Sequence, residues 1–155
     1  RTDIGDTRPS ARSSPAGRPF MSVADQLRYK FIISVEGNDV ATNLKWIMAS
    51  NSLCFMTRPR YETWFMEGTL IPGQHYVLLR DDYADLSERI DYYIEHPDEA
   101  LAIIAQAQRH AAQFRDLRRE KLISLLVFQK YFELSGQGPQ SAHRTAAADG
   151  GASGQ

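Results

Sequence analysis

Three short apolar runs, separated by segments with helical periodicity, constrain the fold of this chain more than any other feature. The runs lie at residues 31–35, 53–56 and 76–79, and turn-forming residues follow the first two. Their length, and the β-branched side chains of the first run, are typical of buried strands. Strands that alternate with helices favour a parallel sheet covered by helices. The sequence therefore predicts an α/β fold with a short parallel sheet.

Helical patterns occupy the segments between the runs. After the first run, apolar residues recur at positions i, i+3 and i+4, which predicts an amphipathic helix over residues 40–50. Either Asn38 or Asp39 is suited to cap this helix with its side-chain oxygen. A shorter helix is expected over residues 61–66, with Gly68 closing it.

The last part of the patterned region is expected to be entirely helical. One helix is expected from Asp85, a suitable N-cap, to His96. A second begins at Pro97, because proline is tolerated in a first helical turn, and a long amphipathic segment continues to Phe132. The predicted architecture is Rossmann-like, with a short parallel sheet flanked by helices and a long helical C-terminal extension.

Composition shifts sharply at both ends of the chain. Residues 1–19 hold three prolines and one large aliphatic residue, so a linker or loop is expected there. Residues 135–155 contain no large aliphatic or aromatic side chain, which predicts a disordered tail. Residues 20–134 are expected to form one domain. Because the chain begins with arginine and shows no leader pattern, we expect it to be a piece of a longer protein.

Charge and residue counts exclude several classes of protein. Lys and Arg number 18 against 19 Asp and Glu, and this balance argues against a nucleic-acid coat, so no nucleic-acid partner is expected. No apolar run reaches the roughly 18 residues that span a bilayer. The single cysteine, Cys54, has no partner for an internal disulfide. The histidines show no metal-ligand spacing, so no metal site is expected.

The turn after the first run is the first candidate for chemistry, because ligands of such sheets bind beyond the carboxyl ends of the strands. Gly37 permits a sharp exit from the strand, and the N–H groups that follow can hold a phosphate. On a helix from residue 40, Thr42 and Lys45 share one face, and such a hydroxyl and ammonium suit a diphosphate. The alternative is a capped surface helix with a solvated Lys45. Asp39 repels phosphate and fits better as a cap or as a partner for sugar hydroxyls.

Two further segments give weaker signals. Carboxylates and aromatic rings in residues 58–68 can bind sugar hydroxyls and stack on a base or a sugar, although core packing is the alternative. A basic group lies late in the chain and consists of Arg115, Arg118, Arg119 and Lys121. Its two interpretations are an exposed helix face and a peripheral contact with a membrane surface or an anionic acceptor.

Six separate stretches of sequence carry a family resemblance. They are YKFIISVEGND at residues 29–39, ASNS at 49–52, YETWFMEG at 61–68, HYV at 75–77, DDYADL at 81–86 and REKLISLL at 119–126. Taken in this order they resemble glycosyltransferase family 90, and within it the bacterial lipopolysaccharide glycosyltransferases. The resemblance covers about residues 20–132. The same family includes fungal capsule-associated proteins and animal protein O-glucosyltransferases.

The resemblance implies a GT-B enzyme, in which two Rossmann-like halves face each other across a cleft. Such an enzyme moves a hexose from a nucleotide sugar, here expected to be a UDP-hexose, to a lipopolysaccharide or related glycan. Residues 20–134 would form the donor-nucleotide-binding domain, without a tightly bound cofactor. The acceptor and the aspartate general base belong to the other half, so no catalytic residue is expected in this chain, which should be inactive alone. The implied location is cytoplasmic, peripheral at the inner membrane.

Carried over by position, the resemblance assigns donor-nucleotide binding to Gly37, Asn38, Asp39, Thr42, Asn43, Lys45 and Glu62. Many relatives carry an arginine where Asn43 stands, so the positive charge rests on Lys45 together with backbone donors. Glu62 corresponds to an acidic residue near the ribose, and Glu67 is the second choice. The alternative function is a non-catalytic binding module with a nucleotide-sugar fold, in which the turn no longer binds a nucleotide.

Overall fold

The computed structural model describes residues 19–137. The chain divides into two compact units, Arg1–Phe114 and Arg115–Gln155, and each is described by itself. The boundary falls inside the region 20–134 that the sequence assigns to one domain. Apart from Pro19 and residues 135–137, the predicted linker and the predicted tail lie outside the described residues.

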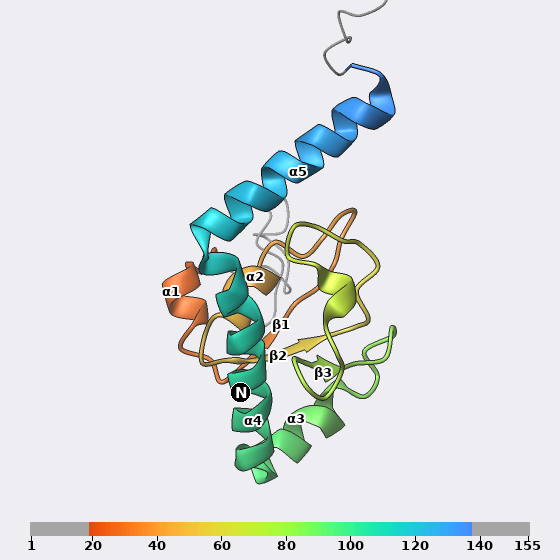
Figure 1. The fold of residues 1–155 in the computed structure, drawn as a ribbon. Coiled ribbons are helices and arrows are strands. Elements are labelled where there is room, and N and C mark those ends of the chain that lie inside the picture. The colour runs from red at the N-terminus through yellow and green to blue at the C-terminus, as the bar shows by residue number, and fades with distance from the viewer. Residues whose placement is uncertain (1–18, 138–155) are drawn as a thin grey trace, which may run out of the picture. The chain divides into compact units, whose positions relative to one another are not determined.

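The first unit contains a three-stranded parallel sheet in the order β1-β2-β3 (Figure 1). The strands are β1 (Phe31–Ile33), β2 (Leu53–Met56) and β3 (Val77–Leu78). Both pairings are parallel, with Ile32 opposite Cys54 in the first. This arrangement confirms the predicted α/β class and the short parallel sheet, although β1 and β3 are shorter than the apolar runs that predicted them.

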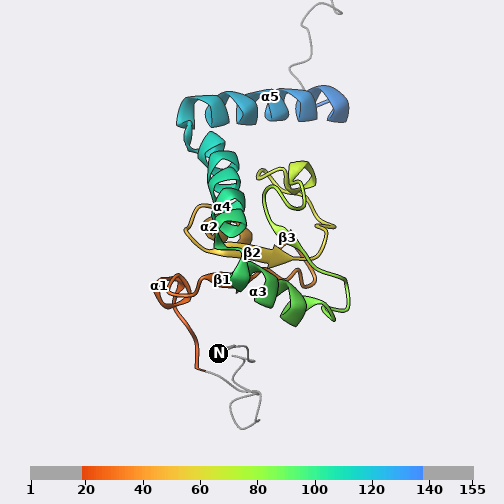
Figure 2. The ribbon, with the colours of Figure 1, turned by 90° about the horizontal axis from the view of Figure 1, so that it is seen from below.

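Helices cover both faces of the sheet, and α2 and α3 lie on opposite sides of it (Figure 2). The helices of residues 19–137 are α1 (Val23–Gln26), α2 (Leu44–Met48), the 3₁₀ helix η2 (Glu67–Thr69), α3 (Leu86–Glu95), α4 (Pro97–Ala112), the 3₁₀ helix η3 (Gln113–Arg115) and α5 (Leu117–Ser135). The predicted break between α3 and α4 is confirmed, since α3 ends at Glu95, His96 is the cap residue between the helices, and Pro97 begins α4. Local sequence is sufficient here because proline suits a first turn.

The core consists of two apolar layers divided by β2. All four residues of β2 are buried, and the strand alternation sends Cys54 and Met56 to one face and Leu53 and Phe55 to the other. The first face packs against α2 and the second half of α4, and the second face packs against α3 and the first half of α4. A strand buried on both faces explains why its sequence is a continuous apolar run.

The start at residue 40 that was predicted for the helix over residues 40–50 is wrong. Helix α2 begins at Leu44, and Asn43 is its N-cap residue without a side-chain capping bond. The carboxylate of Asp39 accepts a hydrogen bond from the N–H of Val40 (2.7 Å), so it stabilises the preceding turn and not the helix. Asp39 and Asn38 therefore do not cap α2.

The prediction of a helix over residues 61–66 is also wrong. The N–H of Thr63 donates to Oε2 of Glu67 (2.7 Å), and its hydroxyl donates to Oε1 (2.8 Å). Met66 then adopts a left-handed conformation with φ 57°, which interrupts any helix. The helical turn forms later, as η2, because the buried carboxylate of Glu67 takes the donors of Thr63.

The long helical segment after Pro97 is interrupted. Helix α4 ends at Ala112, and η3 follows before α5 begins. The carboxylate of Asp116 caps α5 by accepting hydrogen bonds from the N–H groups of Arg118 and Arg119 (3.1 Å each). The Asp116 side chain thus fixes the start of a new helix, and this cap was not predicted from the sequence.

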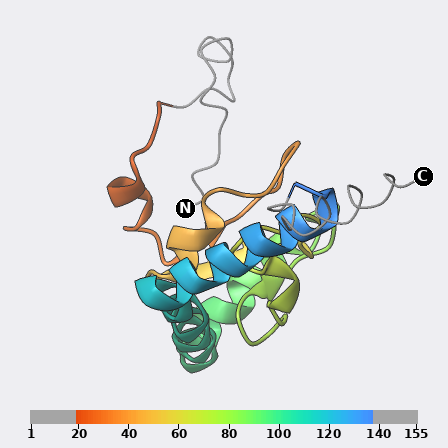
Figure 3. The same ribbon diagram turned by 45° about the horizontal axis from the view of Figure 1, so that its top comes forward.

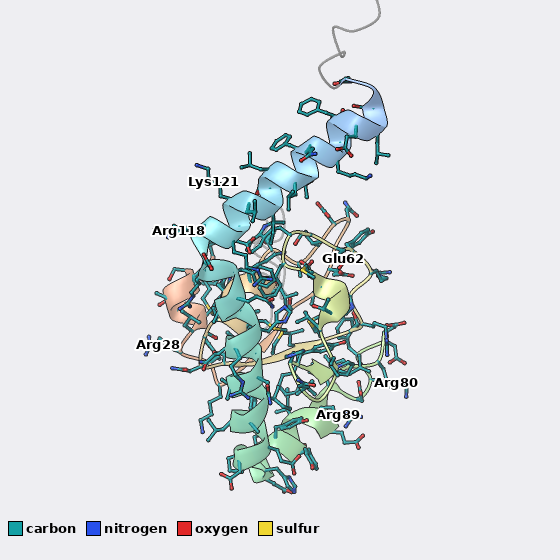
Figure 4. The ribbon with its side chains drawn as sticks, viewed as in Figure 1. Arg28, Glu62, Arg80, Arg89, Arg118 and Lys121 are labelled. Carbon is teal, nitrogen blue, oxygen red and sulfur yellow. The ribbon has the colours of Figure 1, made fainter. Side chains whose placement is uncertain are left out.

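Helix α5 makes up most of the described part of the second unit. Its apolar residues lie around the helix and not on a single face, unlike the predicted amphipathic pattern. The basic group precedes and opens this helix, and Figure 4 labels two of its members, Arg118 and Lys121. Within residues 19–137, no helix combines the length and the apolar character needed to cross a bilayer.

Candidate functional site

A hollow of about 550 Å³ lies beside the carboxyl end of β1. Val23 and Gln26 of α1 form one part of its lining, and the turn before α2 forms another through Ala41, Thr42 and Asn43. Trp46 of α2 contributes an aromatic ring. The segment that leads from β1 into this turn, coloured orange, projects beyond the sheet (Figure 3). The hollow thus occupies the edge at which parallel sheets bind ligands.

The turn presents unused hydrogen-bond donors. Across residues 19–137, no hydrogen bond is made by the backbone N–H groups of Ala41, Thr42 and Asn43 or by the hydroxyl of Thr42. Ala41 is buried, and unpaired backbone donors are rare in buried positions. Consecutive free N–H groups in a turn form a concave site suited to an anion.

Asn43 lines the hollow, but its amide is engaged in holding the turn. Its Oδ1 accepts a hydrogen bond from the hydroxyl of Ser34 (2.9 Å), and its Nδ2 donates to the carbonyl oxygen of Ile33 (3.4 Å). Ser34 is buried at the end of β1. The side chain therefore ties the start of α2 to the carboxyl end of the strand, which leaves its backbone N–H as the available donor.

The remaining turn residues of the sequence prediction lie outside the hollow. Gly37, Asn38 and Asp39 are exposed, and none of them lines the hollow. The N–H of Gly37 donates to the carbonyl oxygen of Asp39 (3.2 Å), which closes the turn. A Cβ added at Gly37 would meet no atom within 4 Å, so packing does not require glycine here.

Lys45 was predicted to face a diphosphate, but its side chain contacts Glu67. Its ammonium donates to Oε1 of Glu67 (2.8 Å) and lies 5.9 Å from the centre of the Phe65 ring. Thr42 precedes α2, so the expected shared helix face of Thr42 and Lys45 does not form. Lys45 is absent from the lining of the hollow.

Glu67 is buried, with only 2% of its surface exposed. Burial by itself raises the pKa of a carboxyl group, but the hydrogen bonds from Lys45 and Thr63 outweigh it and hold the pKa of Glu67 below its ordinary value. Its two oxygens are therefore occupied by protein donors. This arrangement joins α2 to the segment between β2 and β3.

Glu62, the first choice for the ribose carboxylate, is exposed (Figure 4). A Cβ added at Gly68 would lie 3.2 Å from Oε1 of Glu62, so the carboxylate lies against this glycine. Of the two acidic candidates, Glu62 is accessible to a ligand, whereas Glu67 is enclosed.

The structure adds Glu36, which the sequence prediction missed. Its carboxylate accepts hydrogen bonds from the N–H groups of Arg60 (3.1 Å) and Tyr61 (3.3 Å), and it pairs with the guanidinium of Arg60 (3.5 Å). Glu36 therefore holds the loops that leave β1 and β2 together. The partners lie 24 and 25 residues away, so no local pattern reveals the contact.

Family comparison agrees with the sequence motifs. Residues 10–146 match glycosyl transferase family 90. The chain belongs to this family. The match includes every candidate residue of the turn, together with Glu36, Glu62 and Glu67.

Three relatives of the family illustrate the extent of the similarity. The chain is 55% identical over 132 residues to "O-glucosyltransferase LpsA" of Dichelobacter nodosus, covering 85% of this chain and 42% of the relative. It is 29% identical over 122 residues to human "Protein O-glucosyltransferase 3", covering 78% of this chain and 24% of the relative. It is 31% identical over 122 residues to "Protein O-glucosyltransferase 2" of Danio rerio, covering 77% of this chain and 24% of the relative. The chain thus spans less than half the length of these family 90 relatives.

No metal-binding cluster of three or more His, Cys, Asp or Glu side chains occurs in the described part of this family 90 chain. The polar features beside β1 are backbone donors, the Thr42 hydroxyl and the side-chain amides of Gln26 and Asn43. Chemically, such a site suits the oxygen atoms of an anion.

Proposed function

We propose that this chain forms the donor-nucleotide-binding part of a family 90 glycosyltransferase of the GT-B type. The enzyme transfers a hexose from a nucleotide sugar to a lipopolysaccharide or related glycan. The observation that carries the proposal is the hollow beside β1, where Ala41, Thr42 and Asn43 offer unpaired N–H groups. The hexose is glucose, since the three relatives are all named O-glucosyltransferases. Its carrier in this proposal is UDP, as the family resemblance implies.

In this proposal the diphosphate binds the turn before α2. Negative charge grows on the diphosphate as the glycosidic bond breaks, and donors already fixed in position stabilise that charge without reorganising. The free N–H groups and the Thr42 hydroxyl supply such donors. Trp46 provides an aromatic surface in the same hollow.

Lys45 supplies the positive charge that Asn43 lacks. An ammonium has three donors, and the contact with Glu67 uses one of them. The side chain of Lys45 is 20% exposed and does not line the hollow, so the proposal requires its two remaining donors to reach a phosphate oxygen from beside the hollow. Glu62 accepts hydrogen bonds from hydroxyls of the transferred sugar or the glycan, and Asp39 stabilises the turn or accepts hydrogen bonds from sugar hydroxyls.

The acceptor and the general base lie in the other half of the enzyme. Positioning of the two reactants contributes many kcal/mol to such a reaction, on the order of 7–11 kcal/mol in well-oriented cases. The 155-residue chain alone should therefore bind UDP and transfer no sugar. Sugar transfer by this chain alone would contradict the assignment.

A non-catalytic binding module is the second candidate function. The observation in its favour is the ion pair between Lys45 and Glu67, which neutralises the only predicted cation of the site. If this pair has a purely structural role, the turn has no cation for a diphosphate.

Calorimetric titration of UDP distinguishes the two candidates. We expect saturable heat with the wild-type chain, and about a tenfold or greater loss of affinity in Lys45→Ala and Thr42→Val. Lys30→Ala is the matched control, because Lys30 is exposed, precedes β1 at its amino end and lies outside the lining of the hollow. Absence of heat in the wild type supports the non-catalytic module and overturns the donor-binding proposal.

A further inference from the structure

The segment between β2 and β3 exposes large apolar side chains next to a free carboxylate. Trp64 is 63% exposed, and Tyr61 and Met66 are also exposed. Glu62 lies within the same stretch, and in the described part of the chain its carboxylate makes no hydrogen bond or ion pair. Burial of an indole ring is strongly favourable, so an exposed one beside a carboxylate offers a ligand an apolar surface and a hydrogen-bond acceptor.

The stretch is held rigidly from inside. Thr63 donates its N–H and its hydroxyl to the buried carboxylate of Glu67, and Lys45 fixes that carboxylate from α2. Thr63 therefore faces the protein, and its two neighbours, Glu62 and Trp64, are the exposed ones. The backbone at Met66 is left-handed, with φ 57°, a conformation that costs energy for a non-glycine residue.

The indole of Trp64 is supported but not covered. Its ring centre lies 5.8 Å from that of Phe65 and 5.6 Å from that of Phe114, and both ring pairs are nearly perpendicular. Such contacts fix the orientation of the ring while most of its surface stays in solvent. A rigid exposed ring loses little conformational entropy when a ligand stacks on it.

We propose that Trp64 and Glu62 bind a pyranose ring of the sugar substrate. This inference rests on the proposed function, which requires a hexose on the donor and a glycan as acceptor. A pyranose has an apolar C–H face, which suits the indole, and a rim of hydroxyls, which suits a free carboxylate acceptor. An apolar protein partner would leave the Glu62 carboxylate desolvated without a donor, so the charge favours a hydroxylated ligand.

The indole N–H signals of Trp46 and Trp64 test this assignment in the ¹⁵N-labelled wild-type chain. These are the only two tryptophans, and a Trp64→Phe variant assigns both signals. UDP should shift the Trp46 signal, because Trp46 lines the hollow. UDP-glucose or the glucose oligosaccharide maltotriose should shift the Trp64 signal saturably, whereas UDP alone should not.

The outcomes separate this inference from the proposed function. If UDP shifts Trp46 and no sugar shifts Trp64, the pyranose site is overturned and the donor site stands. If neither signal responds, both are overturned. A Trp64 shift with UDP alone assigns the ring to the nucleotide and overturns the pyranose site. A response to UDP-glucose alone identifies the donor hexose, and a response to maltotriose identifies the acceptor glycan.

Two variants examine the carboxylate separately from the ring. Glu62→Gln should lower the sugar affinity, measured from the shift of the Trp64 signal, about tenfold. The control Glu88→Gln, at an exposed position of α3, should leave this affinity unchanged. Gly68→Ala adds a Cβ that would lie 3.2 Å from Oε1 of Glu62, so the carboxylate must shift by a few tenths of an ångström and sugar binding should weaken less than in Glu62→Gln. Unchanged sugar affinity in both variants would remove Glu62 from the site.

Discussion

The ammonium of Lys45 lies 2.8 Å from Oε1 of Glu67, and this pair joins α2 to the segment between β2 and β3. Glu67 is buried and Lys45 is mostly buried, so the interaction is screened less than a surface ion pair. The pair therefore holds in place both the turn beside the hollow and the stretch that exposes Glu62 and Trp64.

Replacing Lys45 with methionine should destabilise the fold. The substitution keeps the volume of the side chain but leaves the Glu67 carboxylate buried without its cation, at a cost of about 2–3 kcal/mol in the free energy of unfolding. Urea denaturation measures the change. The control is Arg80→Met, which removes an exposed pair with Asp82 and should cost at most about 1 kcal/mol. Equal losses in the two variants would contradict this role of Lys45.

His75 should make the fold sensitive to mild acid. Its Nδ1 accepts a hydrogen bond from the N–H of Ile71 (2.9 Å), and the ring of His110 lies 5.2 Å away. Burial, and secondarily the charge of His110, lower the pKa of His75 in the folded state. The unfolded chain, with an ordinary pKa of about 6.5, binds the proton more readily. The contribution of neutral His75 to the free energy of unfolding is therefore fully present above about pH 6.5. It decreases as the pH falls through and below that value.

Urea midpoints at several pH values between neutrality and about pH 5 measure this effect. His75→Gln removes the titrating group and should flatten the profile, whereas His96→Gln, an exposed position, should leave the wild-type slope. An unchanged slope in His75→Gln would show that other groups govern the acid response.

Asn43 should have separable structural and binding effects. Asn43→Ala removes the acceptor of the buried Ser34 hydroxyl and should lower the free energy of unfolding by about 1–3 kcal/mol. Asn43→Asp keeps an acceptor for Ser34, so it should destabilise less, but its negative charge should weaken UDP binding more. Urea denaturation and calorimetry measure the two effects. A loss of UDP affinity that simply follows the loss of stability would contradict the anion site beside β1.

Glu36 should protect the loop after β2 from proteolysis. Its carboxylate accepts hydrogen bonds from the N–H groups of Arg60 and Tyr61, and the N–H of Tyr61 belongs to the peptide bond that trypsin cleaves after Arg60. Glu36→Ala should release the loop and accelerate this cleavage several-fold, as followed by mass spectrometry of the fragments. Cleavage after Arg80 provides the internal control, because Glu36 makes no contact there. Equal acceleration at both positions would indicate general loosening of the fold.

The sequence by itself determined the features that depend on neighbouring residues. The apolar run of β2 predicted its own boundaries, and the His96–Pro97 step predicted the break between α3 and α4. Periodicity and proline geometry act within a few residues, so they can be interpreted without a partner. The motif order also predicted membership of glycosyl transferase family 90.

Only the tertiary structure decided which polar groups meet. Lys45 finds Glu67 22 residues away, and Glu36 finds Arg60 24 residues away. The predicted helix over residues 61–66 does not form because Thr63 gives its donors to Glu67, and α2 begins late because Asn43 bonds to the end of β1. A buried polar group must find a hydrogen-bond partner, and the fold determines which distant partner lies within reach.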